Sequence, residues 1–376
     1  MSPYFAPHVG GVESHVRDLA KYLVEQGDSV TVLTSRFSRM LPALERRGGV
    51  VVRRVPTFLN MLRTPIMPAL YREVMKGGWD VVHSHSPPPV TAYFACTAAN
   101  NIGVPHVLTY HADDEIPIPA IGPVIVALYR ESLGRYTFAH SDQDVVSSQT
   151  YASTSRQVWN YDPEVIGAAI DAGNFGPGID GRALRRSFGI PPPEKGHMVL
   201  FVGRLVPHKG VEFLLEAIPM LRPTARVVVA GEGSHRHVLE ASAAARGLAD
   251  RVVFTGGVPG EELPALYRAA DVCVLPSISR LEAFGLVGLE AMASERPVVL
   301  SNIPGVREVL EDGKEGLLAG PADPEALAAK INTLLDDPTL RATMGVQGRE
   351  RVLKHFTWDV VGAQFRRIYE RLAAQP

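Results

Sequence analysis

Apolar runs of four to six residues alternate with stretches of helical periodicity along most of the chain. In the first half they predict strands at residues 29–34, 50–55, 79–84, 105–110 and 138–141, and a short strand or helix at 144–147. Apolar residues three and four apart predict helices at residues 12–26, 71–76, 91–101 and 124–135. This alternation indicates an α/β fold with a parallel, doubly wound sheet.

A second series of the same kind follows residues 171–196, a segment rich in glycine, proline and charge that we interpret as a linker. Strands are predicted at residues 198–202, 225–230, 252–254, 272–276, 298–300 and 316–318. Helices are predicted at residues 211–221, 236–246, 261–269, 285–293, 324–336, 338–355 and 358–373. We therefore predict two domains of similar architecture, residues 1–174 and residues 175–356.

The first predicted helix follows a glycine turn, Gly10 and Gly11. Such a turn lets a backbone approach a phosphate closely, and it normally follows a strand. Residues 1–9 carry no strand pattern. We therefore expect that a central strand of the first domain lies upstream of residue 1.

Composition narrows the range of functions. A net charge of −2 gives no global basic field, so we expect no nucleic-acid partner. Cys96 and Cys273 lie in apolar surroundings, which is typical of buried free thiols rather than of a disulfide. The sequence has neither a membrane-length apolar run nor a signal-peptide pattern, so we expect a cytoplasmic protein, with peripheral contact at the inner membrane face left open.

The largest group of candidate functional residues lies in residues 277–302, between two predicted strands. Glu282 falls in a loop before a helix that begins near Phe284 or Gly285, and Glu290 lies on that helix. Unpaired N–H groups and the positive end of the dipole make a helix start an anion site. Carboxylates beside an anion site suit a ligand with both phosphates and hydroxyls, such as a sugar nucleotide, although a glutamate on a helix more often faces solvent.

Two basic residues follow the first strand of the second domain, Arg204 directly and Lys209 after a short loop. Because ligands of open parallel sheets bind at the carboxyl ends of strands, these cations are candidates to neutralise a diphosphate. An exposed loop with two ordinary charges is the alternative interpretation. Gly231 and Gly233 form a further turn, but the third glycine of a dinucleotide fingerprint is missing.

Histidines mark the ends of two predicted strands in the first domain. His111 ends the strand at 105–110 and is a candidate substrate contact or, alternatively, a structural histidine. His83 and His85 are separated by one residue, and we expect them to face opposite sides of their strand. No matching cysteine or acid constellation accompanies them, so we predict no metal site.

Five segments together resemble one family: GGVESHVRDLA, FVGRLVPHKG, VVVAGEG, RVVFTGGV and LEAFGLVGLEAMA. They are similar to the retaining, nucleotide-sugar-dependent glycosyltransferases of family four. The resemblance runs from residue 8 to the C-terminus. It implies the GT-B fold, with two Rossmann-like domains that face each other across a cleft and a last helix, within residues 357–376, that returns to the acceptor-binding first domain.

The resemblance also implies roles for individual residues. Arg204 and Lys209 would bind the donor diphosphate, Glu290 the ribose, and Glu282 the transferred sugar. The remaining implied contacts are Gly10 and Gly11 at the donor phosphates, the backbone of Phe284, Gly285 and Leu286 at the sugar, residues 251–258 around the base, and His111 at the sugar or reacting centre. No metal or other cofactor is expected, because cations and the helix dipole take its place.

The resemblance implies transfer of a hexose from a UDP- or GDP-sugar to a hydroxyl acceptor. The apolar, arginine-containing residues 61–70 and 124–135 suit a glycolipid or polyprenol-linked acceptor, although ordinary amphipathic packing explains them as well. Two alternatives remain open: a non-catalytic sugar-nucleotide-binding protein, and a sugar-nucleotide epimerase on a similar fold. The sequence does not identify the base, the sugar, the acceptor or the oligomeric state.

Overall fold

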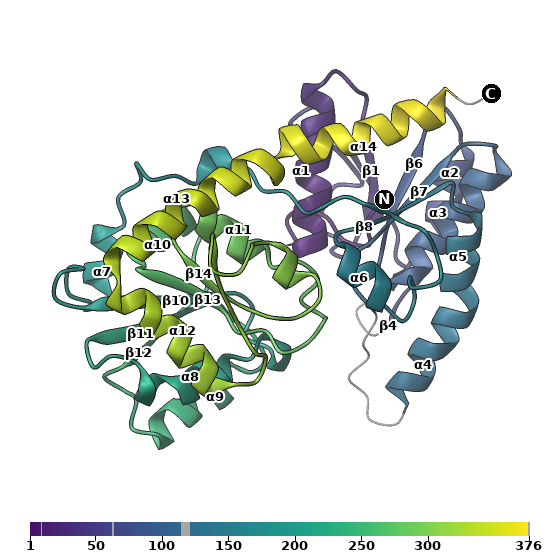
Figure 1. Ribbon diagram of the computed structural model, residues 1–376. Coiled ribbons are helices and arrows are strands. Elements are labelled where there is room, and N and C mark those ends of the chain that lie inside the picture. Colours follow the sequence, from purple (N-terminus) through teal and green to yellow (C-terminus); the bar gives the residue numbers. More distant parts are fainter. Residues whose placement is uncertain (9, 62–63, 114–120, 375–376) are drawn as a thin grey trace. The chain divides into compact units, whose positions relative to one another are not determined.

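The computed structural model describes residues 1–8, 10–61, 64–113 and 121–374, which divide into two compact units (Figure 1). The first unit contains Met1–Ala169 and Trp358–Pro376, and the second contains Ile170–Thr357. Each unit contains parallel strands with flanking helices, as the alternation of strand and helix patterns predicted, and the first unit also has antiparallel strand pairs. None of the helices in the described residues combines the length and the apolar character needed to cross a membrane.

The strands of the first unit form two separate sheets and a small hairpin. One sheet has the order β1-β3-β2, the second is the parallel sheet β6-β7-β8-β9, and β4 and β5 form the hairpin. Their bounds are β1 Thr31–Ser35, β2 Leu44–Arg47, β3 Val50–Val55, β4 Leu59–Met61, β5 Thr64–Ile66, β6 Val82–Ser86, β7 His106–Tyr110, β8 Gln143–Val146 and β9 Glu164–Val165. Met1–Pro3 make backbone hydrogen bonds to both β1 and β6.

Among the described residues, no strand precedes the first helix, and the sheet of the first unit is divided between β1 and β6. The helices of this unit are α1 Gly11–Glu25, α2 Pro68–Met75, α3 Pro89–Asn101, α4 Gly122–Tyr129, α5 Arg135–His140, α6 Gln149–Thr154 and α14 Trp358–Ala373. A π-helical turn, Arg130–Gly134, joins α4 to α5.

The last helix, α14, belongs to the core of the first unit. Its apolar face is buried against Leu19, Tyr22 and Leu23 of α1, in a cluster that also includes residues of β7 and β8. The buried side chains that α14 contributes are Trp358, Val361, Phe365, Ile368 and Leu372. Figure 1 shows α14 alongside α1, although some 330 residues separate them in the sequence.

The second unit is built on one six-stranded parallel sheet of order β12-β11-β10-β13-β14-β15. The strands are β10 His197–Val202, β11 Ala225–Ala230, β12 Val252–Gly256, β13 Val272–Leu275, β14 Val298–Ser301 and β15 Gly316–Ala319. The helices are α7 Arg182–Ser187, α8 Val211–Ala217, α9 Arg236–Ala245, α10 Leu263–Ala269, α11 Leu286–Ala293, α12 Pro324–Asp336 and α13 Pro338–His355. Near-continuous apolar strands are expected here, because helices cover both faces of such a sheet.

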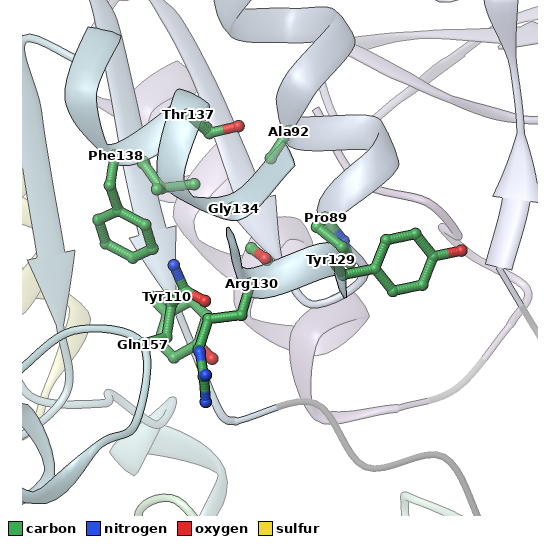
Figure 2. Close-up of a pocket in the computed structure, with 11 residues that line it drawn as sticks. Pro89, Ala92, Tyr110, Tyr129, Arg130, Gly134, Thr137, Phe138 and Gln157 are labelled. Carbon is green, nitrogen blue, oxygen red and sulfur yellow. The ribbon is translucent and has the colours of Figure 1, made fainter. Parts of the chain in front are cut away.

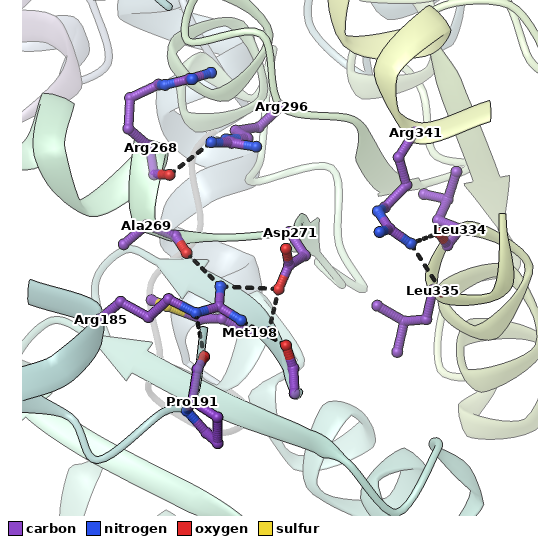
Figure 3. A network of polar contacts seen from close by, with 11 residues as sticks. Arg185, Pro191, Met198, Arg268, Ala269, Asp271, Arg296, Leu334, Leu335 and Arg341 are labelled. Carbon is purple, nitrogen blue, oxygen red and sulfur yellow. Dashed lines mark hydrogen bonds and ion pairs between the residues drawn. The ribbon is translucent and has the colours of Figure 1, made fainter. Parts of the chain in front are cut away.

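A buried ion pair ties the amino ends of β10 and β13 together (Figure 3). The guanidinium of Arg185 donates to the carboxylate of Asp271 at 2.9 Å and to the carbonyls of Pro191, Ala269 and Gly196. The same carboxylate accepts the backbone N–H of Met198 at 2.7 Å. Each hydrogen-bonding partner compensates for the removal of these charges from water.

Several predicted elements differ from the structure. Residues 138–141 were predicted as a strand, but residues 135–140 form α5, and the strand β8 begins only at Gln143. The patterns missed β2, α6 and the β4–β5 hairpin, which are short and partly exposed and so carry weak periodicity. The proposed base loop at residues 251–258 is mostly strand, because its apolar residues form β12.

Candidate functional site

In the sheet of the second unit, β11 and β12 follow on one side of β10 and β13 to β15 on the other, so the strand order reverses between β10 and β13. Ligands of open α/β sheets bind outside the carboxyl ends of the strands at such a switch point. The loop after β10 carries Arg204 and Lys209, and the loop after β13 carries Glu282. Three of the predicted donor-site residues therefore come from the two strands that flank the switch point.

Lys209 and Glu282 form an ion pair across these two loops. Their side chains are each only 12% exposed, so water screens the pair less than it would at an open surface. The hydroxyl of Ser277, which is fully buried, donates to the same carboxylate at 3.0 Å. The family resemblance implies a phosphate contact for Lys209 and a sugar contact for Glu282, and in the structure the two groups contact each other directly.

His208 lies between the two predicted cations. Burial lowers its pKa, and Lys209 and Arg204 lower it further, whereas Glu282 acts in the opposite direction. The backbone carbonyl of His208 accepts the N–H of Ile278 at 2.9 Å, which joins the loop after β10 to the loop after β13. Arg204 is exposed, so its guanidinium is accessible to a ligand at this edge of the sheet.

Glycines allow the loops at this edge to pack against one another. Gly210 has φ +66°, and a Cβ on it would lie 2.1 Å from the carbonyl oxygen of Pro276. Gly231 follows β11, and a Cβ there would lie 1.9 Å from the carbonyl oxygen of Gly203. Only glycine fits such backbone approaches. The turn at Gly231 is thus packed directly against the loop that carries Arg204.

The start of α11 is the place where the sequence predicts an anion site. Gly285 caps the helix with φ +82°, and a Cβ on it would lie 2.9 Å from a methyl group of Leu275. Phe284 is buried and fixes the chain just before the helix. Helix geometry leaves the N–H groups of Leu286 and Val287 without an acceptor within α11, whereas the N–H of Gly288 donates to the carbonyl of Gly285 at 2.8 Å, and this end carries the positive end of the helix dipole.

Glu290 lies on the second turn of α11 and has a different partner from Glu282. The hydroxyl of Tyr267, a fully buried side chain of α10, donates to the Glu290 carboxylate at 2.6 Å. Burial raises the pKa of Glu290 to about 7, and the hydrogen bond from Tyr267 opposes this shift. The carboxyl group of Glu290 is therefore partly protonated and partly ionised near neutral pH.

Gly10, Gly11 and His111 belong to the first unit. Gly10 is the extended residue that caps α1, and Gly11 begins the helix. His111 follows β7, and its Nε2 lies 3.0 Å from Nδ1 of His85. Burial holds the pKa of His111 well below its usual value, with His15 adding to the effect, so the imidazole is neutral at physiological pH.

The structure corrects the expectation for His83 and His85. Their ring centroids lie 4.3 Å apart, on the same side of β6, because strand residues two apart share a face. His15, His85 and His111 offer one nitrogen each within 4.8 Å of one another, a spacing at which three neutral imidazoles could hold a metal ion. The Nε2 atom of His15 is buried without a hydrogen-bond partner in the part of the chain that the structure describes.

A small pocket lies near the carboxyl ends of β6 and β7 (Figure 2). Its lining includes Tyr110, Tyr129, Arg130 and Gln157, and the π-helical turn forms one wall. The cavity has a volume of about 10 Å³, which is room for about one water molecule. It is too small for a sugar as it stands.

The structure thus brings together Lys209, Glu282 and the loop that carries Arg204 in the second unit. Glu290 is instead hydrogen-bonded to the hydroxyl of Tyr267. Four side chains that contact or neighbour the predicted ones were not predicted, namely Ser277, His208, Tyr267 and His15, and His85 was considered only as a metal ligand and rejected. His208 could have been recognised from its place between two cations. Tyr267 could not, because only the fold brings α10 beside α11.

Comparison with known proteins gives matches over both units. A family model described as Glycosyltransferase Family 4 matches residues 9–173, and one described as Glycosyl transferases group 1 matches residues 185–351. An uncharacterized glycosyltransferase of Methanocaldococcus jannaschii is 30% identical, over 96% of this chain and 94% of that protein.

Two further matches extend over nearly the whole chain. The phosphatidyl-myo-inositol mannosyltransferase of Mycolicibacterium smegmatis is 31% identical, over 99% of this chain and 92% of that protein. Among solved structures, the sucrose-phosphate synthase of Thermosynechococcus elongatus has a TM-score of 0.80 and 26% identity, and covers 97% of this chain and 94% of that one.

Proposed function

The chain belongs to the group 1 glycosyltransferases of family four and has their GT-B fold, and from this premise we propose that it transfers a hexose from a UDP- or GDP-sugar to a hydroxyl group with retention of configuration. One observation carries the proposal. The cations and the carboxylate that the donor needs follow β10 and β13, the two strands at the switch point of the sheet.

The donor diphosphate binds to Arg204 and Lys209. Arg204 offers a planar fork of donors to phosphate oxygens, whereas Lys209 acts as a point charge. Glu282 neutralises Lys209 and holds its ammonium in place. The N–H groups at the start of α11 supply further partial positive charge, without the cost of reorganising water as the reaction proceeds.

The carboxylates hold the hydroxyl groups of the donor. Glu282 and the backbone from Phe284 to Leu286 bind the transferred sugar, and Glu290 binds the ribose. The turn after β12 borders the base. In the first unit, the backbone of Gly10 and Gly11 is suited to contact a phosphate, and the neutral imidazole of His111 is suited to contact a sugar hydroxyl.

Catalysis rests on charges that change as the bond breaks. The sugar gains positive charge while the leaving diphosphate gains negative charge, so Arg204, Lys209 and the α11 start bind the transition state more tightly than the substrate. The acceptor hydroxyl attacks the face that the diphosphate leaves, and its proton passes to a phosphate oxygen. The donor site requires no metal ion in this scheme.

A lipid-linked acceptor at a membrane surface is supported by helix α4. Ile121, Val124 and Leu128 are each about 60% exposed or more, and their spacing places them along one side of the helix. Arg130 follows them in the π-helical turn. An exposed apolar stripe beside a cation suits an anionic membrane surface. The M. smegmatis relative is described as acting on phosphatidyl-myo-inositol, which agrees with this acceptor class.

Donor binding and turnover test the proposal. UDP or GDP is expected to raise the melting temperature, and one of the two more than the other, which identifies the base. Lys209→Ala is expected to lower the rate of sugar transfer by roughly 100-fold, a typical effect of removing one stabilising group. Lys314→Ala is the matched control, because Lys314 is 53% exposed and pairs with Glu311 and Glu315 away from the donor loops.

The product distinguishes the alternatives. NMR of the glycoside is expected to show the anomeric configuration of the donor. A covalent sugar adduct on Glu282 would contradict same-face attack. Donor binding without transfer to any lipid or sugar acceptor would favour a non-catalytic binding protein, and release of an epimerised sugar without an acceptor would favour an epimerase.

Vesicle binding tests the acceptor surface separately. The wild-type protein is expected to sediment with vesicles that contain anionic lipid, and Val124→Asp with Leu128→Asp is expected to abolish this. Equal sedimentation of both proteins would exclude α4 as the contact.

A further inference from the structure

Histidines from three separate elements of the first unit meet at one point. His15 lies on α1, His85 on β6, and His111 directly after β7. Their ring centroids are 5.6 Å apart for His15 and His85, 5.1 Å for His15 and His111, and 5.2 Å for His85 and His111. The fold, and not the spacing along the chain, therefore brings three metal-binding side chains together.

Two of these side chains already have nearly the separation of two ligands on one ion. Nδ1 of His85 lies 3.0 Å from Nε2 of His111. Two nitrogens of a tetrahedral zinc site, each about 2.0–2.1 Å from the metal, lie about 3.3 Å apart. A slight widening of this pair therefore makes it a chelating pair, and a closer approach of His15 completes a set of three nitrogens.

His15 supplies a second, independent observation. Its Nε2 atom is buried, and no hydrogen-bond partner for it exists within the described ranges of the chain. Its ring lies among aromatic neighbours, with Trp358 at 5.4 Å and Phe365 at 5.6 Å between ring centroids. A buried polar atom without a partner is unfavourable, and a bound cation would satisfy a ring nitrogen there.

The chemistry of the group selects the kind of ion. Burial lowers the pKa of His15 to about 4 and holds the pKa values of His85 and His111 well below their usual range. All three imidazoles are therefore neutral, which is the form that binds metals. Imidazole nitrogens suit zinc and its neighbours in the transition series, whereas Mg²⁺ and Ca²⁺ prefer oxygen ligands.

We propose that His15, His85 and His111 bind one Zn²⁺ ion, with a water molecule in the fourth position, and that this ion inhibits sugar transfer. Three protein ligands and an open fourth position are a common arrangement around zinc. His15 and His111 are only half-buried, so an ion can reach the group from solvent. The inhibition rests on the proposed function, because zinc would occupy the imidazole of His111 that is suited to contact a sugar hydroxyl. The metal site itself does not depend on the donor chemistry.

Titration of the full chain with Zn²⁺ tests the site. The protein carries no histidine tag and is first freed of metal with a chelator. Calorimetry is expected to show one Zn²⁺ ion bound per chain, and Co²⁺ in its place is expected to give the visible absorption of a tetrahedral complex. No binding of Zn²⁺ by the wild-type protein would overturn the proposal.

Two variants on different elements remove one ligand each. His15→Ala and His85→Asn are each expected to weaken Zn²⁺ binding by at least about 100-fold, because the loss of even an outer-shell partner costs about 10- to 100-fold. His237→Ala is the matched control, since His237 is a 95% exposed histidine of the second unit. Binding in His15→Ala equal to that in the wild type, or equal weakening in His237→Ala, would overturn the proposal.

Melting temperatures show whether the variants are folded. Alanine is favourable within α1, so His15→Ala without metal is expected to melt cooperatively. Zn²⁺ is expected to raise the melting temperature of the wild type and of His237→Ala, but not that of His15→Ala or His85→Asn. The same rise in all four proteins would place the bound zinc elsewhere and overturn the proposal.

Transfer assays test the inhibition separately. Zn²⁺ is expected to lower the transfer rate of the wild type over the concentration range in which it binds, and a chelator is expected to restore the rate. The residual transfer rate of His15→Ala is expected not to respond to the same concentrations. Zinc binding without any loss of transfer would overturn the inhibitory role. A metal-free wild type without transfer activity would instead count against the proposed function, and the calorimetry would still decide the metal site.

Discussion

Replacing Tyr267 by phenylalanine tests the proposed role of Glu290 in holding the ribose. Tyr267 donates a 2.6 Å hydrogen bond to the Glu290 carboxylate, and burial raises its own pKa well above 10, so its hydroxyl keeps the proton it donates. This bond favours the ionised carboxylate, whose pKa lies at about 7. Tyr267→Phe removes the bond while it retains the ring, so the expected effect is electrostatic rather than a packing defect.

The magnitude follows from the chemistry of the bond. A hydrogen bond to a charged group contributes about 1.5–3 kcal/mol, and 1.36 kcal/mol corresponds to a tenfold change in the proton equilibrium. Loss of the bond therefore raises the midpoint of titration by about 1–2 pH units. If the ionised form holds the ribose, donor affinity at pH 7 falls roughly tenfold.

Calorimetric titration with UDP and GDP between pH 5.5 and 9 measures this shift. The nucleotide phosphate also titrates near pH 6, so Glu290→Gln supplies the baseline for each nucleotide. After that baseline is subtracted, wild-type affinity is expected to rise with pH around a midpoint near 7, and Tyr267→Phe is expected to move the midpoint upward. An identical midpoint in the two proteins, or a flat difference from Glu290→Gln, would refute the reasoning.

Three further predictions concern stability and packing. Glu290 binds a proton more tightly in the folded than in the unfolded state, so the free energy of unfolding is expected to fall as pH rises from about 4.5 to about 7, and Glu290→Gln is expected to flatten that slope in urea titrations. Arg185→Leu leaves the buried carboxylate of Asp271 without its ion pair and is expected to destabilise the second unit by about 3–5 kcal/mol. A smaller loss of stability in the double variant with Asp271→Leu would show that the unpaired charge is the cause. Gly210→Ala places a Cβ 2.1 Å from the carbonyl oxygen of Pro276, at a residue with positive φ. This variant is expected to bind the donor more weakly and to melt at a lower temperature. An unchanged dissociation constant for the nucleotide would contradict the tight packing of the two loops.

The three long helices at the end of the chain could be predicted almost to the residue. The helices α12, α13 and α14 have the bounds that the apolar spacing indicated, and Asp323 and Asp337 cap the first two through side-chain bonds to backbone N–H groups. A proline directly after each cap makes the start unambiguous. Short elements with exposed faces, such as β2 and α6, lack such signals and were missed.

In the candidate site, too, some features could be predicted from the sequence and others could not. Arg204, Lys209, Glu282 and Glu290 could be named as candidates because they follow strands or lie near a helix start, which the sequence reveals. Which of these groups touch each other depends on the order of strands in the sheet. Neither the pairing of Glu290 with Tyr267 nor the grouping of three histidines can be read from spacing along the chain.

The return of α14 to the first unit has a consequence for how the protein is made. The residues that complete the core around Leu19, Tyr22 and Leu23 leave the ribosome only after the whole second unit has been made. Domains usually fold in the order of their synthesis. Here the amino-terminal half must wait, with its apolar surface uncovered, while Ile170–Thr357 can already become native. Chaperones would therefore encounter the earlier half of the nascent polypeptide for longer than the later half.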